Sequence, residues 1–259
     1  MSIAICFVAR TGIVLGTDSR VTTTFGEGAT WEDAYPKLVQ FGDRPVALAM
    51  VGAGAFGGRD FRSLIAETWR EHEGALPETI EDVARAYAQT AGRIARDAGA
   101  TQRMDVLVAG YSPGNAFGEL WEVILPAGEV TAQARPQSQT FVWRGQTDAV
   151  KTLWWGADLH ALRQSLEKNE VPRETADAVI AELRERVAWG PTRTNWGMPL
   201  SSAVDIVRFQ LDLQIQAERF LPGRGRCGAP TQIVAINDSG LTWIDQPFPE
   251  FSRVGSARG

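Results

Sequence analysis

The residue best placed to do chemistry stands at the start of the chain, where Ser2 follows Met1 directly. Because Ser2 is small, we expect methionine aminopeptidase to remove Met1, which leaves Ser2 with a hydroxyl and a free α-amine. An α-amine has a pKa of about 8, against about 10.4 for a lysine, so it can accept the hydroxyl proton near neutral pH. Ser2 would then supply both a nucleophile and a base for acyl transfer, without a histidine.

A second pattern, GAGAFG at residues 52–57, matches the GxGxxG of dinucleotide-binding sites. Such a site also needs a strand directly after the helix that follows the glycines. The sequence instead predicts a second helix in that place and two hairpins before the motif. We therefore interpret residues 52–57 as a glycine-rich turn and expect no cofactor.

A third pattern, GYSPG at residues 110–114, matches the GxSxG nucleophile elbow. An elbow leads from a strand straight into a helix, whereas Pro113, Gly114 and Asn115 interrupt the chain here and a strand-like run follows. His160 is the only histidine after Ser112, and it falls in a predicted surface helix. A hairpin turn explains this pattern better than a Ser-His-Asp hydrolase does.

The predicted elements follow one another along the chain in the order strands, two helices, strands, helices, strands. We expect strands at 2–9, 12–17, 37–41, 45–51, 105–110, 118–125, 129–134, 231–237 and 241–244, helices at 59–72, 77–98, 159–166, 174–188 and 201–220, and a long loop at 18–36. This segregation predicts an α+β protein with two antiparallel sheets and helices outside them.

The composition excludes several classes of protein. Of 259 residues, 44% are hydrophobic and 22% charged, the net charge is -5, and no basic run is present, so we expect no nucleic-acid partner. Cys6 and Cys227 form no CxxC or Cys/His spacing, so we expect no metal site. We find no signal peptide or membrane-length apolar stretch and expect a cytoplasmic protein without a membrane partner.

Four segments in order resemble the proteasome β-type subunits. Residues 12–20 (GIVLGTDSR) resemble GVVLAADSR, Lys37-Leu38-Val39 matches the family's lysine before its third strand, and residues 50–55 (MVGAGA) resemble MAGxAAD. Residues 105–128 resemble the hairpin LLVAGYDxxxxxxLYxxDPxG. The separation of Ser2 and Asp18, 18 − 2 = 16, also agrees with the family. Residues 227–230 (CGAP) look more like the bacterial proteasome-related proteins.

The resemblance implies an N-terminal-nucleophile (Ntn) hydrolase fold, a four-layer αββα sandwich of two antiparallel sheets flanked by helices. It predicts a single domain over residues 2–247, with a divergent insertion at about 135–198 and a C-terminal tail at 248–259. Ser2 would be the nucleophile, Asp18 and Lys37 its charged partners, and Gly52 the donor of an oxyanion-hole amide. Met50, Thr22 and Gly54 would be substrate-binding positions.

The function implied is a peptidase or amidohydrolase that forms an acyl-enzyme on Ser2 after loss of Met1. Three departures favour an alternative, a catalytically silent assembly subunit of the same fold. Serine replaces the threonine of the proteasome branch, Arg224 stands near the position of a second catalytic aspartate, and Ala157 and Cys227 stand near two companion serines.

The resemblance also implies partners. We expect a peptide or unfolded-protein substrate, assembly of the chain into a homo-oligomeric ring or ring-like spiral, and room for an ATPase partner. The helix at 59–72 carries Phe61, Leu64, Ile65 and Trp69, and we expect part of this apolar surface to contact a neighbouring subunit.

Overall fold

A computed structural model describes residues 2–25, 28–134, 139–187, 197–220 and 225–255. It is an α+β protein whose described residues separate into two compact units. The first unit comprises the described residues up to Gln146 and those from Gly197 on, and the second comprises residues 147–187.

The first sheet has five antiparallel strands in the order β12-β1-β2-β13-β14. The predicted hairpins at both ends of the chain are confirmed, and they pair with each other through β2 and β13. Helix α6 (Leu200–Glu218) packs on β1, β2 and β13, and it approaches closely because Gly16 has no side chain to displace Leu211. The strands are β1 (Ile3–Ala9), β2 (Gly12–Thr17), β12 (Thr140–Gly145), β13 (Gln232–Asn237) and β14 (Gly240–Asp245).

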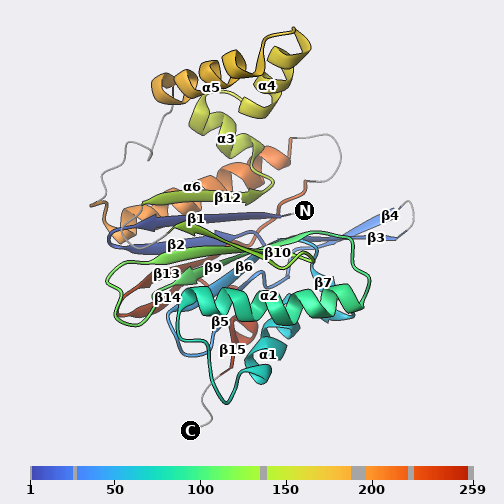
Figure 1. The fold of residues 1–259 in the computed structure, drawn as a ribbon, viewed down its shortest axis with the longest axis vertical. Helices are drawn as coiled ribbons and strands as arrows, with labels where there is room; N and C mark the ends of the chain where they lie inside the picture. Colours follow the sequence, from blue (N-terminus) through green and yellow to red (C-terminus); the bar gives the residue numbers. More distant parts are fainter. Residues whose placement is uncertain (1, 26–27, 135–138, 188–196, 221–224, 256–259) are drawn as a thin grey trace. The chain divides into compact units, whose positions relative to one another are not determined.

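The second sheet has six strands in the order β11-β10-β9-β6-β5-β15, and only β15 runs parallel to its neighbour. Helices α1 (Phe61–Glu71) and α2 (Ile80–Asp97) lie over one face of it (Figure 1). A capping box between Thr79 and Asp82 begins α2, whereas the sequence places Pro77 in its first turn. The strands are β5 (Leu38–Phe41), β6 (Val46–Gly52), β9 (Met104–Gly110), β10 (Glu119–Leu125), β11 (Glu129–Ala134) and β15 (Arg253–Val254).

Two apolar clusters hold this unit together. One joins inward-facing residues of both sheets, including Ala4, Leu15, Ala49 and Leu107, so the sheets pack face to face. The other joins the outer face of the six-stranded sheet to α1 and α2. The alternation of the strands therefore sends every second side chain of β6 to each cluster.

The predicted loop at 18–36 is wrong, because it contains a hairpin of β3 (Val21–Phe25) and β4 (Gly28–Glu32). The polarity of Thr22-Thr23-Thr24 indicates a loop, but threonine is β-branched and favours extended backbone. Two short strands, β7 (Ala55–Phe56) and β8 (Arg59–Asp60), pair before α1.

The described residues of the divergent stretch at 135–198 divide between the two units. Strand β12 lies in it and belongs to the first sheet, where Val142 pairs with Cys6. The second unit holds helices α3 (Asp148–Trp155), α4 (Leu159–Lys168) and α5 (Arg173–Val187), and α5 packs against both others. The predicted helices at 159–166 and 174–188 correspond to α4 and α5.

The predicted C-terminal tail at 248–259 contains regular structure in the part that the structure describes, which reaches residue 255. A short 3-10 helix, η2 (Pro249–Phe251), leads into β15, whose partner is β5. The N–H of Gln40 donates to the carbonyl of Ser252 (2.8 Å) and that of Gly42 to the carbonyl of Val254 (2.7 Å). The segment to Val254 therefore completes the six-stranded sheet.

The apolar residues of α1 are also placed differently from our expectation. Phe61, Leu64 and Ile65 are buried within this chain, and Trp69 packs edge-on against Phe41 with ring centroids 5.1 Å apart. They are therefore core residues and leave little surface for a neighbouring subunit.

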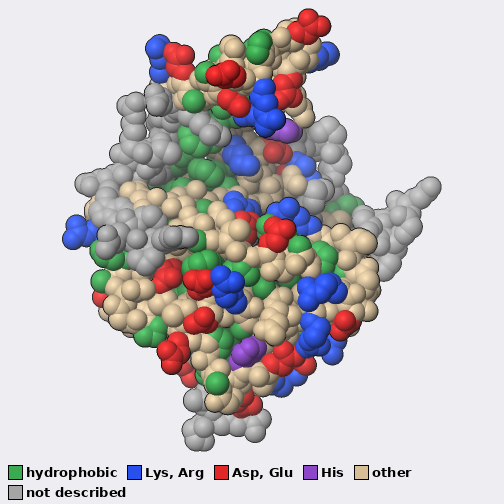
Figure 2. Space-filling view, viewed as in Figure 1, with side chains coloured by type: hydrophobic (Ala, Val, Ile, Leu, Met, Phe, Trp, Pro, Cys, Tyr) green, Lys and Arg blue, Asp and Glu red, His purple; other side chains and the backbone are tan. Residues whose placement is uncertain are grey.

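None of the described helices combines the length and apolarity needed to cross a membrane. Acidic and basic side chains are interspersed over the face seen in Figure 2.

Candidate active site

The carboxylate of Asp18, which follows β2 directly, is held by four donors. Its Oδ1 accepts from the N–H of Ile3 (3.1 Å) and from Lys37 Nζ (2.8 Å). Its Oδ2 accepts from the N–H of Arg20 (3.2 Å) and from the N–H of Gly228 (3.0 Å). These donors come from four separate stretches of chain, so Asp18 is fixed in one orientation.

Lys37 enters the site from the residue before β5, and its side chain, like that of Asp18, has no exposed surface. The contact expected between the two residues is therefore present. Burial lowers the pKa of Lys37, and the nearby Asp18 carboxylate opposes that shift. The ammonium has three N–H donors, and among the described residues Asp18 and the carbonyl of Arg20 accept two of them.

Ser2 lies at the head of β1 and is 3% exposed. Its carbonyl accepts from the N–H of Gln146 (2.8 Å). At Gly145, where φ is +80°, an added Cβ would lie 1.9 Å from the Ser2 carbonyl oxygen, so only glycine fits. Ser2 is bonded to Ile3, whose N–H shares Asp18 Oδ1 with Lys37. Ser2 therefore directly precedes, in the sequence, a residue that is hydrogen-bonded to the buried ion pair.

Contacts of Arg20 and Gly228 hold the loop at 225–230 against Asp18. Arg20 forms a bidentate pair with Asp33 (2.5 and 2.7 Å) and also donates to the carbonyl of Gly225 (2.8 Å). A side chain at Gly228 would meet Arg20 Nε at 2.6 Å, so a glycine is needed where its N–H reaches Asp18. The pairing of Arg20 with Asp33 carries no distinctive sequence signal.

Gln232, also missed, joins the two sheets beside the site. Its Nε2 donates to Ser19 Oγ (3.0 Å) and to the carbonyl of Tyr35 (3.1 Å), and its Oε1 accepts from the N–H of Leu38 (3.3 Å). The side chain is buried, and its amide satisfies backbone groups on either side of Lys37. We interpret Gln232 as a positioning residue.

Gly52 ends β6, where its neighbour two residues before, Met50, donates its N–H to the carbonyl of Lys37 (3.0 Å). Gly52 is exposed, its φ is +95°, and an added Cβ would lie 2.4 Å from the carbonyl oxygen of Arg103. Glycine is therefore required where the strand leaves the sheet. The carbonyl of Gly54 accepts from the hydroxyl of Tyr35 (2.8 Å), and burial raises the pKa of Tyr35 to about 12.

The two remaining predicted binding positions differ in their surroundings. Met50 is buried in the apolar cluster beneath α1 and α2, in company with Phe56. Thr22 is partly exposed on β3 and pairs with Trp31. Their roles toward a substrate stay predictions.

The predicted departures from the family pattern fall in different places. Arg224 and Met1 lie outside the described residues. Ala157 belongs to the second unit. Cys227 is buried next to Gly228, and burial raises the pKa of its thiol, so the thiol is poorly suited to act as a thiolate. Among the described residues, no group of three or more His, Cys, Asp and Glu is arranged to hold a metal ion.

The two decoy patterns have structural roles. Residues 110–114 connect β9 to β10, and Ser112 Oγ accepts from the N–H of Ile80 (3.0 Å) at the start of α2. Residues 52–57 lead from β6 into β7 rather than directly into a helix. Neither pattern supplies the strand-to-helix turn that its chemistry needs.

Comparison with known proteins gives a likeness of fold. No protein-family model matches the chain, and no curated protein does. Among solved structures, Anbu (ancestral beta-subunit) from Yersinia bercovieri aligns with a TM-score of 0.55 and 13% identity over 96% of this chain and 89% of its own. An Anbu (Gly-1) mutant from Hyphomicrobium sp. strain MC1 aligns with a TM-score of 0.57 and 13% identity over 97% and 90%. The chain therefore resembles these Anbu structures in fold.

Proposed function

We propose that this chain is a proteasome-type Ntn peptidase or amidohydrolase whose nucleophile is the Ser2 hydroxyl, exposed to substrate after removal of Met1. The two sheets, with α6 on one side and α1 and α2 on the other, would form the four-layer αββα sandwich of that class. The fold alone does not carry the proposal, because one fold hosts many functions.

The observation that carries it is the buried pair of Asp18 and Lys37 beside the head of β1. Burying two charges costs several kcal/mol in order of magnitude, and stability alone rarely requires such a pair. Here the pair shares one carboxylate oxygen with the N–H of Ile3, the residue after Ser2. A fixed positive charge next to a hydroxyl favours the alkoxide that an acyl transfer needs.

The reaction would proceed in two halves. The free α-amine of Ser2 takes the proton of Oγ as Oγ attacks a carbonyl carbon, and the resulting α-ammonium gives that proton to the leaving amine. The product is an acyl ester on Ser2. Water then attacks the ester carbonyl with the α-amine again as base, and Oγ leaves with the proton. The third N–H of Lys37 would face the developing charge on Oγ.

The N–H of Gly52 would bind the oxyanion, in keeping with its place at the exposed end of β6, two residues after the Met50–Lys37 backbone contact. Thr22 and Gly54 would contact the substrate backbone. Met50 would form the apolar floor of the pocket that takes the residue before the cleaved bond, so we expect a preference for apolar residues there. Peptides or unfolded protein segments are the proposed substrates.

A silent assembly subunit is the second candidate, and one observation favours it. Ser2 is only 3% exposed, so a substrate carbonyl has little access to it while the head of β1 is covered. Edman sequencing of the chain from its own host separates the two candidates. A free Ser2 agrees with the enzyme, and a uniformly retained Met1 agrees with the silent subunit.

We propose homo-oligomeric assembly, in a ring or ring-like spiral, under either candidate, with an ATPase as a further partner for the enzyme. Phe209 on α6 and Phe220 after it are large apolar side chains that are 49% and 86% exposed, and such side chains are typical of subunit contacts. Light scattering should give a mass well above one 28.2 kDa chain. Phe209→Ser should lower it, and a wild-type monomer at physiological salt would refute assembly.

The proposed activity is tested with fluorogenic peptides that differ only in the residue before the cleaved bond. The wild-type chain without Met1 should cleave peptides with an apolar residue there, and Ser2→Ala should abolish cleavage while leaving the fold intact by circular dichroism. Equal cleavage by Ser2→Ala would overturn the proposal.

A further inference from the structure

The described residues include four buried carboxylates, and one of them lacks the basic partner that the other three have. Asp18, Glu119, Glu122 and Glu218 are the buried acids in that part of the chain. A buried carboxylate is stable as an anion only when a cation or several donors compensate it. Three of the four have a basic partner: Asp18 with Lys37, Glu122 with Arg144 and Glu218 with Arg226.

Glu119, the first residue of β10, is the exception. It is 7% exposed, and no basic residue of the described chain forms an ion pair with it. Its Oε1 accepts from Asn115 Nδ2 (2.9 Å), and its Oε2 accepts a long hydrogen bond from Trp121 Nε1 (3.4 Å). Both donors are neutral. The Glu119 carboxylate therefore accepts two hydrogen bonds, but no cation of the described chain neutralises its charge.

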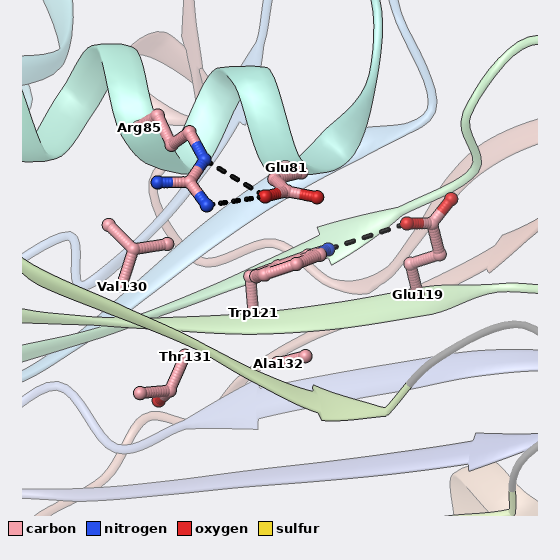
Figure 3. Close-up of a pocket in the computed structure, with 7 residues that line it drawn as sticks. All are labelled: Glu81, Arg85, Glu119, Trp121, Val130, Thr131 and Ala132. Atoms are coloured by element: carbon pink, nitrogen blue, oxygen red, sulfur yellow. Dashed lines mark hydrogen bonds and ion pairs between the residues drawn. The ribbon is translucent and has the colours of Figure 1, made fainter.

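This carboxylate lines a cavity of about 600 Å³ between α2 and the β10–β11 pair, which we call the Glu119 pocket (Figure 3). The indole of Trp121 forms one wall, and Glu81 and Arg85 project from α2. Its full lining is Glu81, Arg85, Glu119, Trp121, Val130, Thr131 and Ala132.

The charges of the pocket do not cancel. Arg85 donates through Nε and Nη2 to Glu81 Oε1 (2.9 and 2.6 Å), so these two side chains neutralise each other. Glu119 remains, which leaves the pocket one negative charge in excess. A single cation would complete it, as Lys37, Arg144 and Arg226 complete the other three buried acids.

We propose that the Glu119 pocket binds a peptide segment through one arginine or lysine side chain. The cationic head would meet the Glu119 carboxylate, and the alkyl stem or guanidinium plane would lie on the indole of Trp121. The cavity is larger than one side chain needs and falls within the usual size of ligand sites, so the adjacent peptide backbone fits as well. The site is separate from Ser2, and the proposal does not depend on the peptidase function.

The test compares acetyl-Gly-Arg-Gly-amide with acetyl-Gly-citrulline-Gly-amide, because citrulline keeps the shape of arginine and lacks its charge. Affinities are measured by ligand-observed NMR on the full chain. The arginine peptide should bind at least about tenfold more tightly than the citrulline peptide, since a charge-assisted hydrogen bond is roughly twice as strong as a neutral one. Glu119→Gln should remove that difference, and Trp121→Leu should weaken both peptides.

Glu250→Gln is the matched control. Glu250 is exposed in η2 and lies outside the pocket, and this substitution changes the net charge by the same amount as Glu119→Gln. It should leave both affinities unchanged. Circular dichroism verifies that each variant is folded. Equal affinity for the two peptides, no binding of either, or an equal effect of Glu250→Gln and Glu119→Gln would overturn the proposal.

Discussion

Lys37 Nζ donates to Asp18 Oδ1 over 2.8 Å at a place where neither side chain is exposed to solvent. The same oxygen accepts from the N–H of Ile3, so the ion pair is tied to the head of β1. The proposed chemistry and the local stability therefore depend on one pair of charges, and variants of that pair can separate the two.

Lys37→Met should remove the charge and keep most of the side-chain volume. We expect it to lower the free energy of unfolding by about 3–5 kcal/mol, because Asp18 would stay buried without its cation. Adding Asp18→Asn to Lys37→Met should recover part of that loss, since the two changes are coupled. Urea unfolding measures both.

The control for this prediction is the exposed pair of Arg253 and Asp43, 2.6 Å apart with side chains 50% and 55% exposed. Arg253→Met should cost only about 0–1 kcal/mol, because solvent screens exposed pairs. Equal costs for Lys37→Met and Arg253→Met would contradict a special role for the buried pair.

The activity should fall on the alkaline side as Lys37 loses its proton. Burial lowers the pKa of Lys37 from its ordinary 10.5, so this fall should begin below that pH. Stability should change in the opposite direction. Between the lowered pKa of the folded state and 10.5, Lys37 is protonated in the unfolded chain but not in the folded one. The contribution of Lys37 to the free energy of unfolding therefore rises with pH over that range. The pH profile of kcat/KM, and unfolding of wild type against Lys37→Met, test these signs. A fall in kcat/KM that begins only above pH 10.5 would contradict the predicted activity profile.

Gly145→Ala should disturb Ser2 directly. The new Cβ would lie 1.9 Å from the Ser2 carbonyl oxygen, at a residue whose φ is +80°. Gly114→Ala is the matched control, because its φ is +78° and nothing lies within 4 Å of the added Cβ. We expect about 1–2 kcal/mol of destabilisation from the left-handed backbone alone at Gly114, and more than that with loss of activity at Gly145. Thermal unfolding and peptide cleavage would show the difference, and equal effects would argue against crowding at Ser2.

Thr17→Val should stabilise the chain. The Thr17 hydroxyl is buried and has no hydrogen-bond partner among the described residues, so an apolar isostere should raise the free energy of unfolding by about 1 kcal/mol. Thr68→Val is the contrasting change, because the Thr68 hydroxyl donates to the carbonyl of Leu64 (2.9 Å), and its loss should be destabilising. Calorimetric unfolding of both variants checks this pair of opposite signs, and a stability loss at Thr17 would indicate a partner for its hydroxyl.

The sequence predicts the parts of the site that depend on local pattern and family resemblance. The spacing of Ser2 and Asp18 and the lysine before β5 are recognised through the resemblance to proteasome β-type subunits. The N–H of Gly228 could not be predicted, because its contact with Asp18 joins residues 210 apart and is set by packing. The β3–β4 hairpin lies in a segment whose polarity indicates a loop, although the threonines in that segment favour a strand.

The central claim, that the Ser2 hydroxyl is an acylating nucleophile once Met1 is removed, is tested most directly by top-down mass spectrometry after incubation with a peptide-mimetic β-lactone. A β-lactone acylates a nucleophilic hydroxyl and leaves the whole reagent attached, so the added mass can be located by fragmentation. We expect one acyl group on Ser2 of the chain that lacks Met1, and none on Ser2→Ala. A folded chain without Met1 that takes no label at Ser2, or a chain that retains Met1 and is labelled there equally, would contradict it.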